Sequence, residues 1–85
     1  MKQRRKPLGK KNVIGANVER LRRSKGIKQK DFVAQMQAAG VDINPNSYSK
    51  LEGQVRSATD REVYIIAKLL GVPMENLYDP TDFWF

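Results

Sequence analysis

Hydrophobic side chains recur at helical spacing in short stretches that glycine and proline separate. In the first stretch, Ile14, Val18 and Leu21 fall on one face of a predicted helix that begins near Asn12 and ends at Gly26. No stretch of useful length alternates between apolar and polar residues, as a half-buried strand would. The pattern therefore predicts an all-α protein.

A second helix is predicted from about Gln29 to just before Gly40. Its apolar positions Phe32, Val33 and Met36 form one stripe, which we expect to face the interior. The residues that follow, 41–43, are predicted to form a linking turn.

The dipeptide Asn44-Pro45 is the sharpest local signal in the chain. Asn is a preferred N-cap, and Pro suits the first helical position because its missing N–H would be unpaired there anyway. A short third helix is therefore predicted from Pro45 to about Glu52, closed by Gly53.

The surface of this third helix is expected to be polar. Only Tyr48 and Leu51 are plainly apolar, so core volume cannot be the main purpose of the helix. Its remaining side chains are those of Asn46, Ser47, Ser49, Lys50 and Glu52.

Two further helices are predicted towards the C-terminus. Thr59 and Glu62 fit a capping box that opens a strongly hydrophobic and central fourth helix, ended by Gly71. A short fifth helix starts at Pro73 and breaks at Asp79-Pro80. The apolar residues of these two helices are Val63, Ile66, Ala67, Leu70, Met74 and Leu77.

The charge is divided unevenly along the chain. Residues 1–30 hold twelve Lys or Arg and one acid, a balance of +11, whereas residues 31–85 hold four bases and eight acids, a balance of −4. Such a basic segment is typical of a protein with a polyanion partner, and equally of a solvated tail. The charge alone does not distinguish between these two interpretations, so the pattern of residues along the chain is also needed.

The composition excludes several classes of protein. The chain has no Cys and no His, so neither a disulfide framework nor a Cys/His zinc site is available, and no carboxylate pair suggests acid–base catalysis. No cofactor, metal or small-molecule effector is expected. The longest apolar run is residues 63–67, too short to span a membrane. We expect a cytoplasmic protein that is not an enzyme.

From about Asn12 to Tyr78, residues in order resemble the lambda-repressor/Cro-type helix-turn-helix family, also called the Xre family. The matching stretches are Ile14-Gly15, residues 18–22, Gly26-Ile27-Lys28-Gln29, Ile43-Asn44, residues 48–52 and residues 66–72. The resemblance implies a compact five-helix bundle at residues 12–78 that binds DNA with its third helix in the major groove. Residues 37–42 lengthen the usual turn between the second and third helices.

The resemblance assigns the exposed residues of the third helix to base edges. Asn46 and Lys50 lie one turn apart, opposite Leu51; Asn can pair with adenine, and Lys can donate to guanine N7 and O6. The expected base contacts are Asn44, Pro45, Asn46, Ser47, Ser49 and Lys50. The alternative is a helix face that is merely solvated.

Phosphate contacts are expected from Gln29 at the start of the second helix, where unpaired N–H groups favour an anion. The full set is Lys28, Gln29, Gln54, Arg56 and Ser57. For Arg56 a solvated loop position is an equal alternative. Residues 1–11 are interpreted as a basic flexible arm that follows the DNA or only aids solubility; its candidate contacts are Arg4, Arg5, Lys6, Lys10 and Lys11.

The resemblance also pairs Arg22 with Glu52 in a partly buried salt bridge that fixes the third helix to the scaffold. Their role would be architectural, since truncating either would leave a buried charge unpaired.

The predicted function is that of a transcriptional regulator, a repressor, that binds operator DNA as a two-fold dimer. Met74, Leu77, Tyr78 and the aromatic tail (residues 79–85, with Phe83-Trp84-Phe85) are the candidate dimer surface; alternatively, these aromatics cap the core. The alternative functions are an antitoxin-like or polymerase-docking interaction module that also binds DNA, and non-specific nucleic-acid binding by the arm alone.

Overall fold

Four α-helices and one 3-10 helix make up residues 8–79, the part of the chain that the computed structural model describes. They are α1 (Gly15–Ser24), α2 (Gln29–Ala38), α3 (Pro45–Glu52), α4 (Asp60–Leu70) and the 3-10 helix η1 (Met74–Leu77). Residues 8–79 contain no strand, which confirms the all-α prediction. The fifth predicted helix is a single 3-10 turn and not an α-helix.

The two strongest local signals, Asn44-Pro45 and the capping box at Thr59, lie at the starts of α3 and α4, as predicted. The Asn44 side chain accepts a hydrogen bond of 2.8 Å from the Ser47 backbone N–H, with Pro45 in the first position of α3. At the start of α4, Thr59 and Glu62 form the reciprocal capping box. Each cap satisfies backbone N–H groups that have no partner within the helix.

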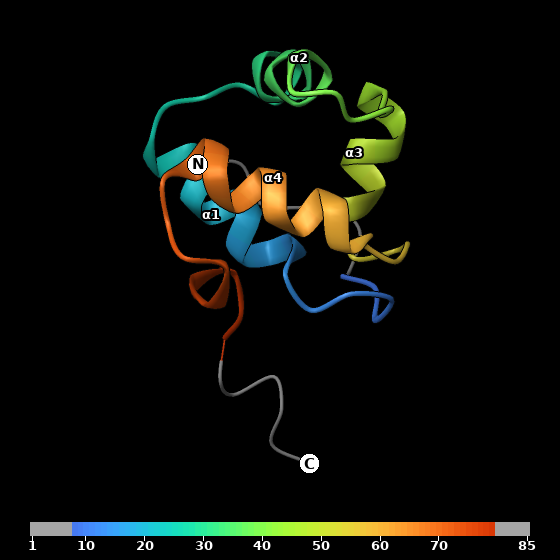
Figure 1. Cartoon of the computed structure of the whole chain (residues 1–85). Helices are drawn as coiled ribbons and strands as arrows, with labels where there is room; N and C mark the ends of the chain where they lie inside the picture. The colour runs from blue at the N-terminus through green and yellow to red at the C-terminus, as the bar shows by residue number, and fades with distance from the viewer. Residues whose placement is uncertain (1–7, 80–85) are drawn as a thin grey trace.

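α4 crosses the middle of the molecule and packs against α1, α2 and η1, while α3 packs against α1 and α2 (Figure 1). The core between them is apolar, as the periodicity predicted. Its residues are Ile14, Val18, Phe32, Val33, Met36, Val41, Ile43, Tyr48, Leu51, Ile66, Ala67, Leu70 and Leu77. None of the helices in residues 8–79 is both long and apolar enough to cross a membrane.

The connection between α2 and α3 is tied to the core. Val41 and Ile43 are both buried, and the Gln37 side chain donates 2.8 Å to the Ile43 carbonyl. Gly40 adopts a φ of +96°, which turns the chain at the end of α2. Two side chains of this connection, Val41 and Ile43, therefore belong to the core.

Gly53 is the C-cap of α3, as predicted, and the next residue makes the turn. Gly53 keeps a helical φ of −77°, and Gln54 takes the left-handed conformation with φ 59°. The Val55 N–H donates a hydrogen bond to the Lys50 carbonyl, and the Gln54 N–H donates one to the Leu51 carbonyl. This pair of hydrogen bonds is the pattern of a Schellman C-cap. A non-glycine residue thus holds the turn that ends α3.

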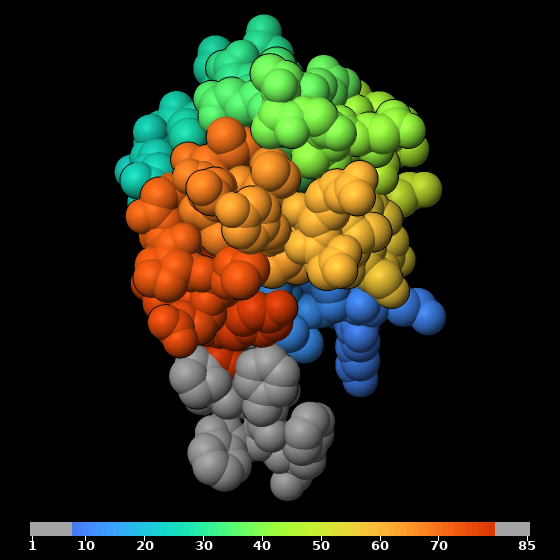
Figure 2. All heavy atoms as spheres, in the orientation of Figure 1, coloured from blue at the N-terminus to red at the C-terminus, as the bar shows by residue number. Residues whose placement is uncertain are grey.

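The N-terminal segment lies against this turn (Figure 2). The Gly9 N–H donates 2.8 Å to the Gly53 carbonyl, and the Lys11 N–H donates 2.9 Å to the Gln54 carbonyl. A Cβ at Gly9 would lie 2.2 Å from the Gln54 carbonyl oxygen, so the approach requires glycine. Residues 9–11 of the predicted flexible arm are therefore bound to the domain.

Two parts of the sequence prediction fall on residues outside 8–79: the arm contacts Arg4, Arg5 and Lys6, and the aromatic residues 83–85. The predicted dimer surface is divided. Leu77 is fully buried in the core, so it cannot form a surface contact, whereas Met74 is 48% exposed and Tyr78 is half-buried.

Candidate nucleic-acid interface

One face of α3 is polar and exposed, and the fold makes no use of two of its side chains. Asn46 and Lys50 are exposed, while Tyr48 and Leu51 on the opposite face are fully buried. Among residues 8–79, neither Asn46 nor Lys50 has a side-chain hydrogen bond or ion pair. These two side chains are therefore available to a ligand.

The other predicted base contacts differ in availability. Pro45 and Asn44 are exposed, but the Asn44 side chain caps α3. Ser47 and Ser49 are half-buried, and the Ser47 carbonyl accepts a hydrogen bond from Arg56. These residues belong to the same helix as Asn46 and Lys50. The first turn of that helix is held by the hydrogen bonds of Ser47 with Asn44 and Arg56.

Beneath this face lies a buried polar cluster centred on Glu52, whose side chain is fully buried. Arg22 donates to both carboxylate oxygens, from Nε at 2.7 Å and from the second guanidinium nitrogen at 3.1 Å. The Tyr48 hydroxyl and the Gln29 amide also donate, one to each oxygen. The structure thus contains the pair that the family resemblance implied, and adds two donors to it.

The charges of Arg22 and Glu52 balance each other within the cluster. Burial alone would lower the pKa of Arg22, but the hydrogen bonds and charge of Glu52 outweigh it and raise this pKa above its ordinary value. Burial and the Glu52 charge raise the pKa of the Tyr48 phenol strongly. Arg22 also donates 2.6 Å to the Ile27 carbonyl, which connects the turn before α2 to the same cluster.

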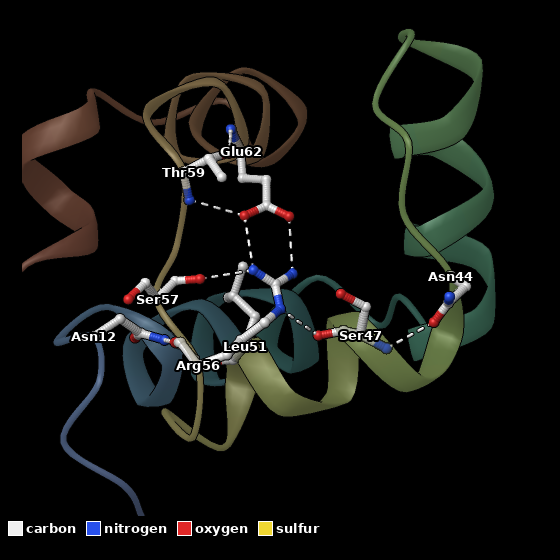
Figure 3. Close-up of polar contacts among 8 residues, drawn as sticks. All are labelled: Asn12, Asn44, Ser47, Leu51, Arg56, Ser57, Thr59 and Glu62. Atoms are coloured by element: carbon white, nitrogen blue, oxygen red, sulfur yellow. Dashed lines mark hydrogen bonds and ion pairs between the residues drawn. The ribbon is translucent and has the colours of Figure 1, made fainter.

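A second cluster is centred on Arg56, in the loop between α3 and α4 (Figure 3). Its guanidinium donates twice to the Glu62 carboxylate, at 2.9 and 2.8 Å. It also donates to the carbonyls of Ser47 in α3 and of Ser57. Arg56 therefore fastens the first turn of α3 to the capped start of α4.

Glu62 is held in its charged form by this arrangement. Burial alone would raise its pKa, but the hydrogen bonds and charge of Arg56 and the hydrogen bond from the Thr59 N–H lower it below the ordinary value. Figure 3 shows the Glu62 carboxylate facing both Arg56 and Thr59.

Three of the five predicted phosphate contacts have roles inside the fold. Gln29 binds Glu52, and Arg56 binds Glu62 and two carbonyls. The Gln54 side chain donates to the Gly9 carbonyl and accepts from the Ala16 N–H at the start of α1. Lys28 and Ser57 are exposed, as are the arm residues Lys10 and Lys11.

Sequence reasoning missed the roles of Asn12, Gln54 and Arg56. Asn12 donates to the Leu51 and Arg56 carbonyls and accepts from the Ile14 and Gly15 N–H groups. The contacts with Leu51 and Arg56 join residues 39 and 44 positions apart, which no local spacing reveals. The capping box did mark Glu62, but its ion-pair partner gave no signal beyond being a loop arginine.

The chain matches no family model, and neither a curated protein nor a solved structure was found to match it. The residues of the chain itself are therefore the basis for its function.

Proposed function

We propose that this protein binds double-stranded DNA sequence-specifically as a transcriptional regulator of the lambda-repressor/Cro type. In this proposal α2 and α3 form the helix-turn-helix, and α3 lies in the major groove. Asn46 contacts adenine and Lys50 contacts guanine, the pairings that their donor and acceptor groups favour.

The observation that carries the proposal is the exposed polar face of α3. A short helix with two fully buried anchors, and with Asn46 and Lys50 unused among the described residues, presents donors and acceptors outward. The major groove admits one α-helix and displays a distinct pattern at each base pair. A helix of eight residues, about 12 Å long, fits that groove.

The rigidity of α3 gives the proposal further support. Both ends of the helix are fixed: Glu52 through the buried cluster, and Ser47 through Asn44 and Arg56. A base-reading side chain loses less entropy on binding when its backbone is already ordered. The two polar clusters would thus favour DNA recognition without touching DNA.

The distribution of charge supports a polyanion partner. Three exposed lysines lie on segments that contact the C-terminal end of α3, and their charges suit phosphate groups. They are Lys28 before α2, and Lys10 and Lys11 on the docked N-terminal segment. Gln29 would contribute its backbone N–H and the side-chain N–H that does not bind Glu52. Gln54 and Arg56 would act as supports for the interface and not as phosphate contacts.

A two-fold dimer on a near-palindromic site is part of the proposal, with half-sites roughly 34 Å apart. Met74, exposed on η1, remains a candidate for its surface, whereas Leu77 belongs to the core.

The test is selection of bound duplexes from a random pool by the full chain, followed by affinity measurements at several salt concentrations. We expect one recurrent sequence, bound at least about 10³-fold more tightly than random duplex. Palindromy and half-site spacing in the selected duplexes would report the dimer. Recovery of unrelated sequences, with equal affinity for selected and random duplexes, would reject sequence-specific binding.

A further inference from the structure

The fold gathers two exposed apolar side chains beside the C-terminal end of α3. Four large hydrophobic side chains are exposed in residues 8–79, and two of them are Leu8, 45% exposed, and Val55, 53% exposed. A Cβ built at Gly9 would lie 3.0 Å from the Val55 Cα, so the backbone at Gly9 lies directly against Val55. The exposed Leu8 is the residue before this close approach.

Val55 is also held next to a predicted base contact. Its N–H donates 3.0 Å to the carbonyl of Lys50, which lies in the last turn of α3. In a Schellman C-cap the residue in the position of Val55 returns alongside the residue in the position of Lys50. Lys50 is itself exposed.

The exposure of Val55 does not result from a loose loop. The preceding residue, Gln54, is fixed by three hydrogen bonds. Its carbonyl accepts from the Lys11 N–H, its side-chain amide donates to the Gly9 carbonyl, and its side-chain oxygen accepts from the Ala16 N–H. The carbonyl of the following residue, Arg56, accepts 2.8 Å from Asn12. Val55 is therefore presented to solvent at a fixed position, at no further ordering cost to its backbone on binding.

We propose that Val55 is a specificity-determining residue that contacts the C5-methyl group of a thymine, next to the base pair that Lys50 contacts. This inference rests on the proposed function, because it places α3 in the major groove. There, the thymine methyl is the apolar group among the distinguishing features of the base edges. An aliphatic side chain beside a base-reading lysine thus selects thymine.

The test uses the duplex that the full chain selects from a random pool, with each thymidine in turn replaced by deoxyuridine. This replacement removes only the methyl group. We expect one replacement per half-site to weaken wild-type binding about fourfold, the effect of burying one methyl group. Val55→Ala should bind the parent duplex about fourfold more weakly and show no response to deoxyuridine at that position.

Two further variants complete the design. Val55→Thr keeps one methyl group of the side chain and should retain part of the response to deoxyuridine. Tyr64→Ala removes an exposed apolar side chain from α4 and should leave the whole pattern as in the wild type. Because Val55 and Tyr64 are both exposed, the melting temperatures of the three variants should stay close to that of the wild type.

The outcomes separate this inference from the proposed function. If no duplex is selected above the random pool, the proposed function fails, and this inference fails with it. If a duplex is selected but Val55→Ala keeps the same response to deoxyuridine as the wild type, only the role of Val55 is overturned. The same holds if no replacement of thymidine affects binding by the wild type.

Discussion

The guanidinium of Arg22 and the carboxylate of Glu52 form a two-pronged ion pair in the interior, although the two residues are 30 positions apart in sequence. Arg22 is 5% exposed and Glu52 is fully buried. The pair joins the last turn of α1 to the last residue of α3. The orientation of the exposed α3 face therefore depends on a charge interaction beneath it.

Replacing Arg22 with Met should destabilise the domain by about 3–5 kcal/mol, because the Glu52 carboxylate would remain buried without its counter-ion. A loss of this size approaches the whole stability of a small domain. Thermal unfolding followed by circular dichroism would measure it. The double variant Arg22→Met with Glu52→Gln should recover part of the loss, since no buried charge would remain unpaired.

The matched control is Arg23→Ala, which breaks the exposed pair between Arg23 and Glu19. Exposed ion pairs contribute about 0–1 kcal/mol, so its unfolding curve should lie near that of the wild type. Coincident curves for Arg22→Met and Arg23→Ala would refute a structural role for the buried pair.

Glu62 should make the stability of the domain sensitive to acid. Its folded-state pKa lies below the unfolded value of roughly 4.3, so its charge stabilises the fold above that pH. This contribution is lost as the pH falls through the folded pKa. Glu62→Gln, which can still accept at the cap, should cost about 1.5–3 kcal/mol at pH 7.

Urea unfolding from pH 7 to pH 3 would test this prediction. The difference between the wild type and Glu62→Gln should shrink steadily towards pH 3. Glu75→Gln, at an exposed position on η1, serves as the control for the loss of an exposed carboxyl group. A difference for Glu62→Gln that stays constant with pH would show that its ionisation does not contribute.

Tyr48 should make the free energy of unfolding depend on pH in alkaline solution. Its folded-state pKa is raised far above the unfolded value of about 10, so the phenol stays protonated in the fold and ionises only on unfolding. Its contribution is complete below pH 10 and decreases above it, by about 1.4 kcal/mol per pH unit.

Unfolding of Tyr48→Phe should lack this part of the alkaline slope, whereas Tyr64→Phe, at an exposed position on α4, should keep it. The free energy of unfolding measured between pH 8 and pH 11 provides the test. Equal slopes for Tyr48→Phe and the wild type would contradict the buried, protonated phenol.

Gly9→Ala should release the N-terminal segment from the end of α3, because the added methyl group would collide with the Gln54 carbonyl. Hydrogen exchange at the Lys11 and Ala16 amides should then accelerate, since both bond Gln54. Leu8→Ala, one residue earlier and exposed, should leave both amides protected. Unchanged exchange in Gly9→Ala would mean that the segment tolerates a side chain there.

The helices were predictable because their signals are local. Asn44-Pro45, the capping box at Thr59 and the apolar spacing in α4 each act within one or two turns of a helix. The end of α3 at Gly53 followed from a local signal too, whereas α1 begins at Gly15 and not near Asn12. After Gly53, Gln54 takes the left-handed conformation, and its side chain and carbonyl bond to the N-terminal segment and α1.

The supports of the candidate interface were not predictable in the same way. The Arg56–Glu62 pair, the Asn12 bridge to Leu51 and the docking of Gly9 all depend on which segments meet in space. A basic or amide side chain in a loop looks the same in sequence whether it binds phosphate or a carbonyl. The exposed residues of α3 were easier to identify, because their opposite face had to be apolar.

Lys50 and Asn46 provide the most direct test of the claim that α3 reads bases. Equilibrium binding of Lys50→Ala and Asn46→Ala would be measured on the selected duplex and on random duplexes, with Lys68→Ala on α4 as the control for charge loss. We expect each α3 variant to lose about 1–3 kcal/mol on the selected duplex and to relax base preference at one position, with smaller losses on random duplexes. Equal losses on both kinds of duplex would contradict direct base reading by α3.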